Sequence, residues 1–388
     1  MADFRLSPEA EALRGELLGW LAALDADVLA SHADGDDLTG LTEDFERGLQ
    51  AAAGARGWLD LPLEHQAVFN FEVARADAPL IDTAMTLTGA AVRNGATNDH
   101  HRQVLAAMVA GQVEACSAYT EPGAGSDLGA MAATAIRPPG GDGWVLDGTK
   151  TLITGPHKAD WCVTLARTAA DAAPRDAFSM FLVDMSAAGV TVQAQPTLNG
   201  WLLGEVHFDR VRLAPEALLG VEGEGWRQMG TALAAERSGT FWLGFARHAL
   251  DQLGAHVCAT DHEDGVLADD PLVLDTVGRL ETAWASADLL SRRALWSQMT
   301  GTDEARHTAM AKVVTTELLQ EIAQAATEIA GADGLVWAPL FSGRGLDAAD
   351  GGRFAWEYLE RVHGTIGGGA NEVHRDAIAA TVLGRPSR

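Results

Sequence analysis

Two short segments of the chain combine hydroxyl side chains with glycines in a way suited to holding a ligand. The first runs Thr120-Glu121-Pro122-Gly123-Ala124-Gly125-Ser126-Asp127, and the second runs Gly148-Thr149-Lys150-Thr151-Leu152-Ile153-Thr154-Gly155. Glycine lets a backbone come close to a ligand, and hydroxyl groups donate and accept hydrogen bonds without adding charge. We expect the second segment to begin at a tight Asp147-Gly148 hairpin and to continue as a strand.

The overall composition disfavours several classes of partner. The 388 residues carry a net charge of -26, from 54 acidic and 28 basic side chains. So acidic a chain is poorly suited to nucleic acid or to an anionic membrane surface. The first residues lack the basic and apolar regions of a signal peptide, and no apolar run has the length of a membrane span. We therefore expect a cytoplasmic protein.

The residues that most often hold metals show no suitable spacing. The chain has three cysteines, Cys116, Cys162 and Cys258, which are far apart in the sequence. They form no metal or redox motif and fit a reducing compartment, so we expect all of them to be small buried hydrophobes. The histidines show no ligand spacing either. The sequence therefore predicts no metal site.

The periodicity of the sequence changes twice, which predicts a helical N-terminal domain (1–112), a β-rich middle domain (113–225) and a helical C-terminal domain (226–388). Strand-like runs in the middle region are separated by turn residues such as Pro138-Pro139-Gly140-Gly141 and Asn199-Gly200. The fold class is therefore α+β. The long C-terminal helices are expected at 226–260, 271–300, 304–331 and from about Asn371 to Gly384.

This α–β–α order, together with the two segments above, resembles the acyl-CoA dehydrogenase family over essentially the full length. The run Ile366-Gly367-Gly368-Gly369-Ala370-Asn371-Glu372-Val373-His374-Arg375 is similar to the family's Tyr-Glu-Gly-Thr-Asn-Glu-Ile-Gln-Arg motif. The resemblance implies the family's fold, an FAD cofactor and the α,β-dehydrogenation of an acyl thioester to the trans-2-enoyl thioester. Electrons then pass to an external acceptor. The acyl carrier is either coenzyme A or an acyl carrier protein.

The resemblance also assigns five residues to the flavin. Thr120 hydrogen-bonds the pyrimidine end of the ring, Gly125 belongs to the loop along the phosphates, and Ser126 contacts the pyrophosphate or the substrate. Thr154 lies near flavin N5. Leu152 stands where the family commonly has tryptophan, so the ring keeps an apolar neighbour and loses an aromatic one.

The same comparison finds that a catalytic group is missing. Removal of the weakly acidic α-proton needs a positioned base, and the family's usual glutamate is Gly368 here. Gly368 keeps a backbone N–H that can donate to the thioester carbonyl. Some members carry the base on the first long C-terminal helix, just before an arginine, and this chain has Glu236-Arg237 there. Glu236 is therefore the predicted base, and the alternative is an exposed helix acid beside Arg237.

One segment departs from the family in a way that bears on assembly. Family members carry an arginine that reaches the FAD of a neighbouring subunit, and the matching run 258–265 has three acids and no arginine. Acidic groups repel a diphosphate. The assembly is therefore either a homo-oligomer or a heterotetramer with a paralogous subunit, as in steroid side-chain-degrading members. Two other functions stay open: a flavin monooxygenase or N-hydroxylase on the same fold, and a non-catalytic partner subunit.

Overall fold

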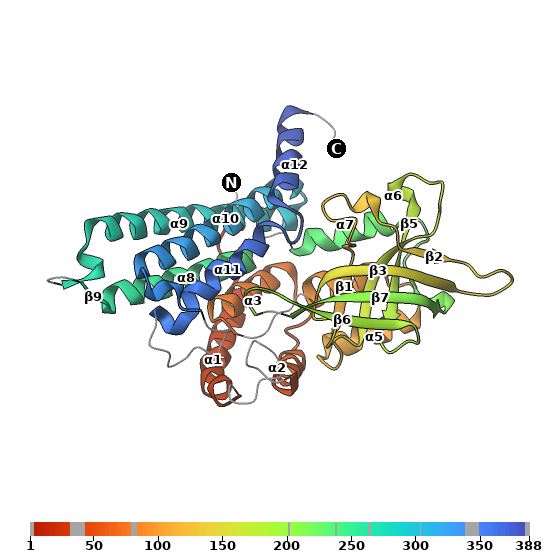
Figure 1. Cartoon of the computed structure of the whole chain (residues 1–388), viewed down its shortest axis with the longest axis horizontal. Helices are drawn as coiled ribbons and strands as arrows, with labels where there is room; N and C mark the ends of the chain where they lie inside the picture. Colours follow the sequence, from red (N-terminus) through yellow and green to blue (C-terminus); the bar gives the residue numbers. More distant parts are fainter. Residues whose placement is uncertain are drawn as a thin grey trace. The chain divides into compact units, whose positions relative to one another are not determined.

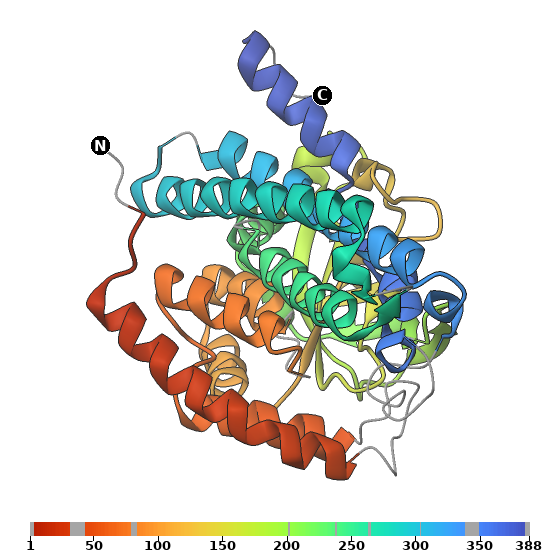
Figure 2. The same cartoon turned by 90° about the vertical axis from the view of Figure 1, so that its left-hand side faces the viewer.

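The structure of the chain is a computed structural model (Figures 1 and 2) that divides into two compact units. The first unit consists of residues 1–42, 61–79 and 237–388, and the second consists of residues 43–60 and 80–236. The boundaries of the three predicted domains stay a prediction. The structure describes residues 4–31, 43–78, 84–200, 202–236, 239–262, 265–302, 304–337 and 349–384.

The second unit is built on a mixed sheet. Among the described residues the sheet has eight strands in the order β6-β7-β3-β2-β4-β5-β8, and β1 pairs with β4 in parallel. Its core includes Trp144 and Phe181, whose rings meet edge to face at 5.4 Å. The strands are β1 (Ala115–Ala118), β2 (Thr134–Ile136), β3 (Trp144–Thr154), β4 (Trp161–Arg167), β5 (Phe178–Asp184), β6 (Val190–Pro196), β7 (Leu202–Leu213) and β8 (Leu218–Leu219).

The second unit contains helices in addition to this sheet. A π-helix, Ala84–Gly89, runs directly into α4 and contacts both β1 and α7. The side chain of Asn98 caps α5 by accepting a hydrogen bond from the N–H of His101 (2.9 Å), which satisfies one of the free donors at a helix start. The α-helices are α2 (Glu43–Ala55), α4 (Ala90–Gly95), α5 (Asp99–Val109), α6 (Pro174–Ala177) and α7 (Gly225–Glu236).

The first unit is a helical bundle with one short hairpin. Helices α8, α9 and α10 lie alongside one another (Figure 2) around an apolar core that includes Leu250, Leu280 and Leu319. The hairpin pairs β9 (Asp261–His262) with β10 (Gly265–Val266). The helices are α1 (Pro8–Ser31), α3 (Leu63–Arg75), α8 (Thr240–Ala259), α9 (Pro271–Thr300), α10 (Glu304–Ala330), α11 (Arg353–Glu360) and α12 (Asn371–Leu383). None of the helices in the described part of the chain has the length and apolar character needed to cross a membrane.

The fold confirms the α+β class and the helices predicted near 271–300, 304–331 and 371–384. The predicted helix at 226–260 is instead two helices, α7 and α8, and the chain before α8 includes Gly239 with φ +78°. Glycine adopts this left-handed conformation without the clash that a Cβ atom causes. The alanine- and leucine-rich composition on both sides hid this break from a periodicity argument.

Two local predictions were wrong. Asp147 and Gly148 lie inside β3 rather than in a hairpin. A Cβ atom on Gly148 would come 2.5 Å from the Cβ of Ala133, so the glycine lets the residue before β2 come close to β3. Cys258 is exposed, whereas Cys116 and Cys162 are buried as expected. These two also stand side by side in the β1–β4 register.

Candidate functional site

The first predicted ligand segment leaves the sheet after β1 and folds around a buried carboxylate. Glu121 accepts hydrogen bonds from the N–H groups of Ala132 (2.6 Å) and Ala133 (3.1 Å). It also pairs with Lys150 of β3, whose Nζ lies 2.7 Å from Oε1, and the two side chains are 6% and 0% exposed. Buried charges are tolerated only when they are paired and hydrogen-bonded. This ion pair therefore holds the loop that begins at Thr120 against the sheet.

Lys150 makes further contacts beneath the loop. Its ammonium group donates to the carbonyl of Tyr119 (3.2 Å) and contacts the sulfur of Met131 (3.6 Å). Burial lowers the pKa of Lys150, and the charge of Glu121 acts in the opposite direction. The sequence interpretation gave Lys150 no role. The signal that could have identified Lys150 is its position in β3, an even number of residues after the buried Trp144, because alternate residues of a strand face the same side of the sheet.

The second predicted segment contains a bulge where a residue was expected to face the flavin ring. Between the pairs Lys150–Val206 and Ile153–Gly204, β3 has one residue more than β7. Leu152 lies in this bulge with φ +57°, and 60% of its surface is exposed. Non-glycine residues rarely adopt this conformation, and bulges re-aim side chains beside functional sites. The bulge thus turns an apolar side chain outward.

The structure joins the two segments, and three of their hydroxyl groups remain available to a ligand. The N–H of Thr151 donates to the carbonyl of Thr120 (2.9 Å). The side chains of Thr120, Ser126 and Thr154 form no hydrogen bond with another described residue. Ser126 and Thr154 are exposed and Thr120 is half-buried, while Gly125 is exposed with open space where a Cβ atom would be. Neutral hydroxyls, accessible backbone and an apolar neighbour are the groups that fit FAD.

Gly368 lies in a glycine turn of the first unit, just before α12. Gly368 and Gly369 have φ +67° and +99°. The carbonyl of Gly368 accepts a hydrogen bond from Nε2 of His374 (3.2 Å), and that of Gly369 accepts one from Nζ of Lys312 (2.8 Å). A trans peptide holds its C=O and N–H on opposite sides. These contacts therefore turn the N–H groups of Gly369 and Ala370 away from His374 and Lys312.

Helix α10 anchors the same turn. Lys312, which is 3% exposed, also donates to Oδ1 of Asn371 (2.7 Å). The side-chain amide of Asn371 donates to Glu317 (3.0 Å) and Thr316 (3.2 Å). The sequence interpretation missed Lys312, and the signal for it is a single lysine within an apolar stretch of helix. The turn is thus held from one side by a buried cation.

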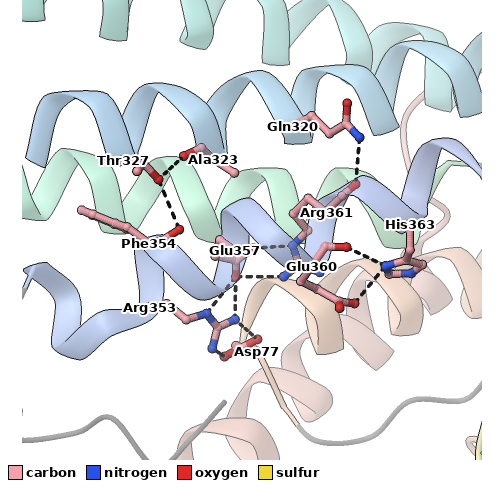
Figure 3. A network of polar contacts seen from close by, with 10 residues as sticks. All are labelled: Asp77, Gln320, Ala323, Thr327, Arg353, Phe354, Glu357, Glu360, Arg361 and His363. Atoms are coloured by element: carbon pink, nitrogen blue, oxygen red, sulfur yellow. Dashed lines mark hydrogen bonds and ion pairs between the residues drawn. The ribbon is translucent and has the colours of Figure 1, made fainter. Parts of the chain in front are cut away.

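A chain of alternating charges supports the helix that leads to this turn (Figure 3). Arg353 donates to both carboxylate oxygens of Asp77 (2.6 and 2.8 Å) and to Glu357 (2.8 Å), and Arg361 donates to Glu357 (2.9 Å). Burial opposes the ionisation of Glu357, but Arg361 and Arg353 outweigh it and lower its pKa to about 2. The charged pairs therefore fix α11 in the first unit.

The network continues into the glycine turn through His363. Its Nδ1 lies 3.0 Å from the carboxylate of Glu360 (Figure 3), and its carbonyl accepts hydrogen bonds from the N–H groups of Ile366 (2.9 Å) and Gly367 (2.8 Å). Burial lowers the pKa of His363, but the hydrogen bond and charge of Glu360 outweigh this and raise it. His363 thus connects α11 to the turn.

The predicted base ends the second unit. Glu236 is the last residue of α7, and its side chain and all of Arg237 lie outside the described residues. Gly368 belongs to the other unit. The base role of Glu236 stays a prediction, as do the roles of Gly368 and of the five flavin residues.

Comparison with known proteins gives this arrangement its class. Residues 116–211 match the family model "Acyl-CoA dehydrogenase, middle domain", and residues 223–383 match "Acyl-CoA dehydrogenase, C-terminal domain". The chain belongs to the acyl-CoA dehydrogenase family, whose members are FAD-dependent flavoprotein oxidoreductases of lipid metabolism.

Individual relatives agree with this assignment. Acyl-CoA dehydrogenase IpdE1 of Mycobacterium tuberculosis is 30% identical over 410 residues, which cover 97% of this chain and 98% of the relative. Among solved structures, the Tcur3481-Tcur3483 steroid ACAD has a TM-score of 0.87 at 23% identity and covers 100% of both chains. The ChsE4-ChsE5 complex of Mycobacterium tuberculosis has a TM-score of 0.86 at 24% identity, also with 100% coverage of both chains. At these identities the two structures show the fold.

Proposed function

We propose that the chain catalyses the FAD-dependent α,β-dehydrogenation of an acyl thioester, acyl-CoA, to the trans-2-enoyl thioester. The observation that supports this most directly is the surface of the second unit, where Thr120, Leu152 and Thr154 come from two segments joined by one backbone hydrogen bond. Their accessible hydroxyls and apolar side chain suit a flavin ring. Thr120, Gly125, Ser126 and Thr154 would hold FAD, which would supply the acceptor for a hydride from the β-carbon of the substrate and the route for electrons to an external acceptor.

The residues of the chain then have distinct roles. Thr120 and Thr154 orient the ring, and Gly125 and Ser126 approach the phosphates with groups that add no charge. Leu152 covers the ring with an apolar surface and excludes water.

Two groups of the chain activate the substrate. Glu236 removes the α-proton. The backbone N–H of Gly368 donates to the thioester carbonyl as enolate character develops. His374 and Lys312 support this role because they hold the carbonyls of Gly368 and Gly369 and so fix the turn that carries the donor.

A conservative substitution tests the proposed base. Glu236→Gln should keep bound FAD and lower the rate of its reduction by acyl-CoA by roughly 10²–10⁴-fold. Glu224→Gln is the matched control, because Glu224 lies just before the same helix and pairs with Arg227 at the surface. Stopped-flow absorbance of the flavin measures both rates. Equal rates in the wild type and Glu236→Gln would remove Glu236 from the mechanism.

A partner-subunit role is the second candidate, and the β9–β10 hairpin favours it. Asp261 and His262 are exposed there, and the family arginine is absent from the run 258–265. Solved structures with this fold include the ChsE4-ChsE5 complex and the Tcur3481-Tcur3483 steroid ACAD. We propose that this chain likewise assembles with a paralogous subunit, and that only some interfaces hold FAD.

Co-purification tests this candidate. The chain expressed alone should contain little flavin, and co-expression with a paralogue should restore the flavin absorbance in a heteromeric complex. Size-exclusion chromatography with light scattering and the visible spectrum measure mass and occupancy. A homotetramer with full FAD occupancy would reject the heteromeric assembly.

A further inference from the structure

We propose that Gln195 is a positioning residue for the flavin: it holds Leu152 in its left-handed conformation and so shapes the surface on which the ring lies. The inference rests on the proposed function. Gln195 belongs to β6, which pairs with β7, and β7 in turn pairs with β3. A side chain from the edge of the sheet therefore reaches the bulge that carries Leu152.

Three hydrogen bonds define this contact. Oε1 of Gln195 accepts from the N–H of Leu152 (3.2 Å) and from the hydroxyl of Thr151 (3.2 Å), and Nε2 donates to the same hydroxyl (3.0 Å). At the bulge the backbone of β3 departs from regular pairing with β7. The amide of Gln195 thus takes the place of a strand partner for the Leu152 N–H.

The conformation of Leu152 requires such a support. A leucine at φ +57° is strained, because its Cβ atom crowds the backbone. Strained residues persist only where their surroundings over-determine them, and they cluster at functional sites. Among the described residues, Gln195 is the side chain that hydrogen-bonds this N–H. The outlier therefore points to a role for the residue that maintains it.

Loss of the bulge would disturb the predicted flavin surface. If the bulge were replaced by regular pairing, the register of β3 would shift by one residue. Such a shift turns side chains to the opposite face of a sheet. Leu152 would then point inward, and Thr154 would move with it. The N–H of Thr151, which holds Thr120, lies in the same bulge. Gln195 acts on all of these groups through Leu152 and Thr151.

A double-mutant cycle tests the inference on the full chain. Gln195→Ala removes the support, and Leu152→Gly removes the need for it, because glycine adopts positive φ without strain. The four proteins of the cycle are stripped of flavin and titrated with FAD, with flavin fluorescence giving the dissociation constant. Gln193→Ala is the matched control. Gln193 is an exposed residue on the same face of β6.

A second readout is independent of the cofactor. Amide hydrogen exchange of the segment around Leu152 reports whether its N–H is protected in the absence of FAD. The midpoint potential of bound flavin is a third readout, because a change in sheet stability alone does not move it. Together these measurements separate a local effect at the bulge from a general loss of folding.

The inference predicts a definite pattern of results. Gln195→Ala should raise the FAD dissociation constant about tenfold in the wild-type background and by less than about threefold in the Leu152→Gly background, a coupling expected of residues in contact. It should also speed exchange at Leu152 and shift the flavin potential, whereas Gln193→Ala should change none of these.

Other outcomes would contradict it in distinguishable ways. Equal effects of Gln195→Ala in both backgrounds would show that Gln195 acts through general stability and overturn the proposal. Unchanged exchange at Leu152 would overturn it as well. A folded wild-type chain that binds no FAD would contradict the proposal that the chain by itself is an FAD-dependent dehydrogenase, and the exchange experiment would still decide whether Gln195 holds Leu152.

Discussion

Lys150→Met should strongly destabilise the second unit, because it leaves a carboxylate buried without its cation. Lys150 is 0% exposed and the side chain of Glu121 is 6% exposed. In the variant, Glu121 keeps only the N–H donors of Ala132 and Ala133. Removing one partner of a buried ion pair costs about 3–5 kcal/mol. The two remaining donors place the expected loss at the lower end, about 3 kcal/mol.

A second substitution should partly reverse this loss. Lys150→Met combined with Glu121→Gln leaves no buried charge, and the amide oxygen can still accept a backbone hydrogen bond. We expect the double variant to recover at least about 1 kcal/mol relative to Lys150→Met, because removing both charges of a buried pair is far less costly than removing one. This recovery is specific to the ion pair.

Amide hydrogen exchange is the suitable assay, because a chain of two units need not unfold in one transition. Protection of segments in β3 and in the loop after β1 gives the local free energy of unfolding. Arg102→Met is the control, since its ion pair with Asp99 lies at the surface and should matter little. A loss below about 1 kcal/mol for Lys150→Met, or a double variant no more stable than the single one, would refute the reasoning.

Two further predictions concern the first unit. Glu357 has a pKa of about 2 against an ordinary value of 4.5; its ionised form therefore stabilises the fold above pH 4.5, by about 3 kcal/mol, and this is lost as the pH falls toward 2. The midpoint temperature of thermal unfolding should fall over that pH interval more steeply for the wild type than for Glu357→Gln. An equal pH dependence of the two midpoints would contradict the assignment of this stabilisation to Glu357. Gly369→Ala should cost about 1–2 kcal/mol, because φ is +99° and the new Cβ atom would lie 3.0 Å from Nε2 of His374. Gly367→Ala is its control in thermal unfolding, since its nearest neighbour would be 3.5 Å away, and an equal loss in both variants would contradict the argument.

Much of the fold was predictable because helix periodicity and turn residues are local signals. Helices α9, α10 and α12 begin and end close to the expected residues, and the Asn199-Gly200 turn separates β6 from β7 as expected. The Asp147-Gly148 prediction failed because the same dipeptide that favours a hairpin also suits a bulge beside another strand. Only the close contact of Gly148 with Ala133, the residue before β2, distinguishes the two cases.

The candidate site shows the same division. Hydroxyls and glycines near Thr120 and Thr154 are recognisable from their local pattern. Their supports are not, because each comes from elsewhere in the chain: Glu121 and Lys150 are 29 residues apart, Leu152 and Gln195 are 43 apart, and Lys312 and Gly369 are 57 apart. A lysine or a glutamine in isolation carries no mark of such a role.

By itself, then, the sequence determined the class of this protein, because its two hydroxyl- and glycine-containing segments, its helix lengths and the run from Ile366 to Arg375 are properties of short stretches of chain. Tertiary structure alone decided how those runs are held. It placed a buried cation under the loop that begins at Thr120, a second one against the glycine turn and an edge-strand glutamine on a strained leucine. The physical reason is that burial and hydrogen bonding depend on which distant segments come together, and a charge or an amide acquires its role only when water is excluded around it.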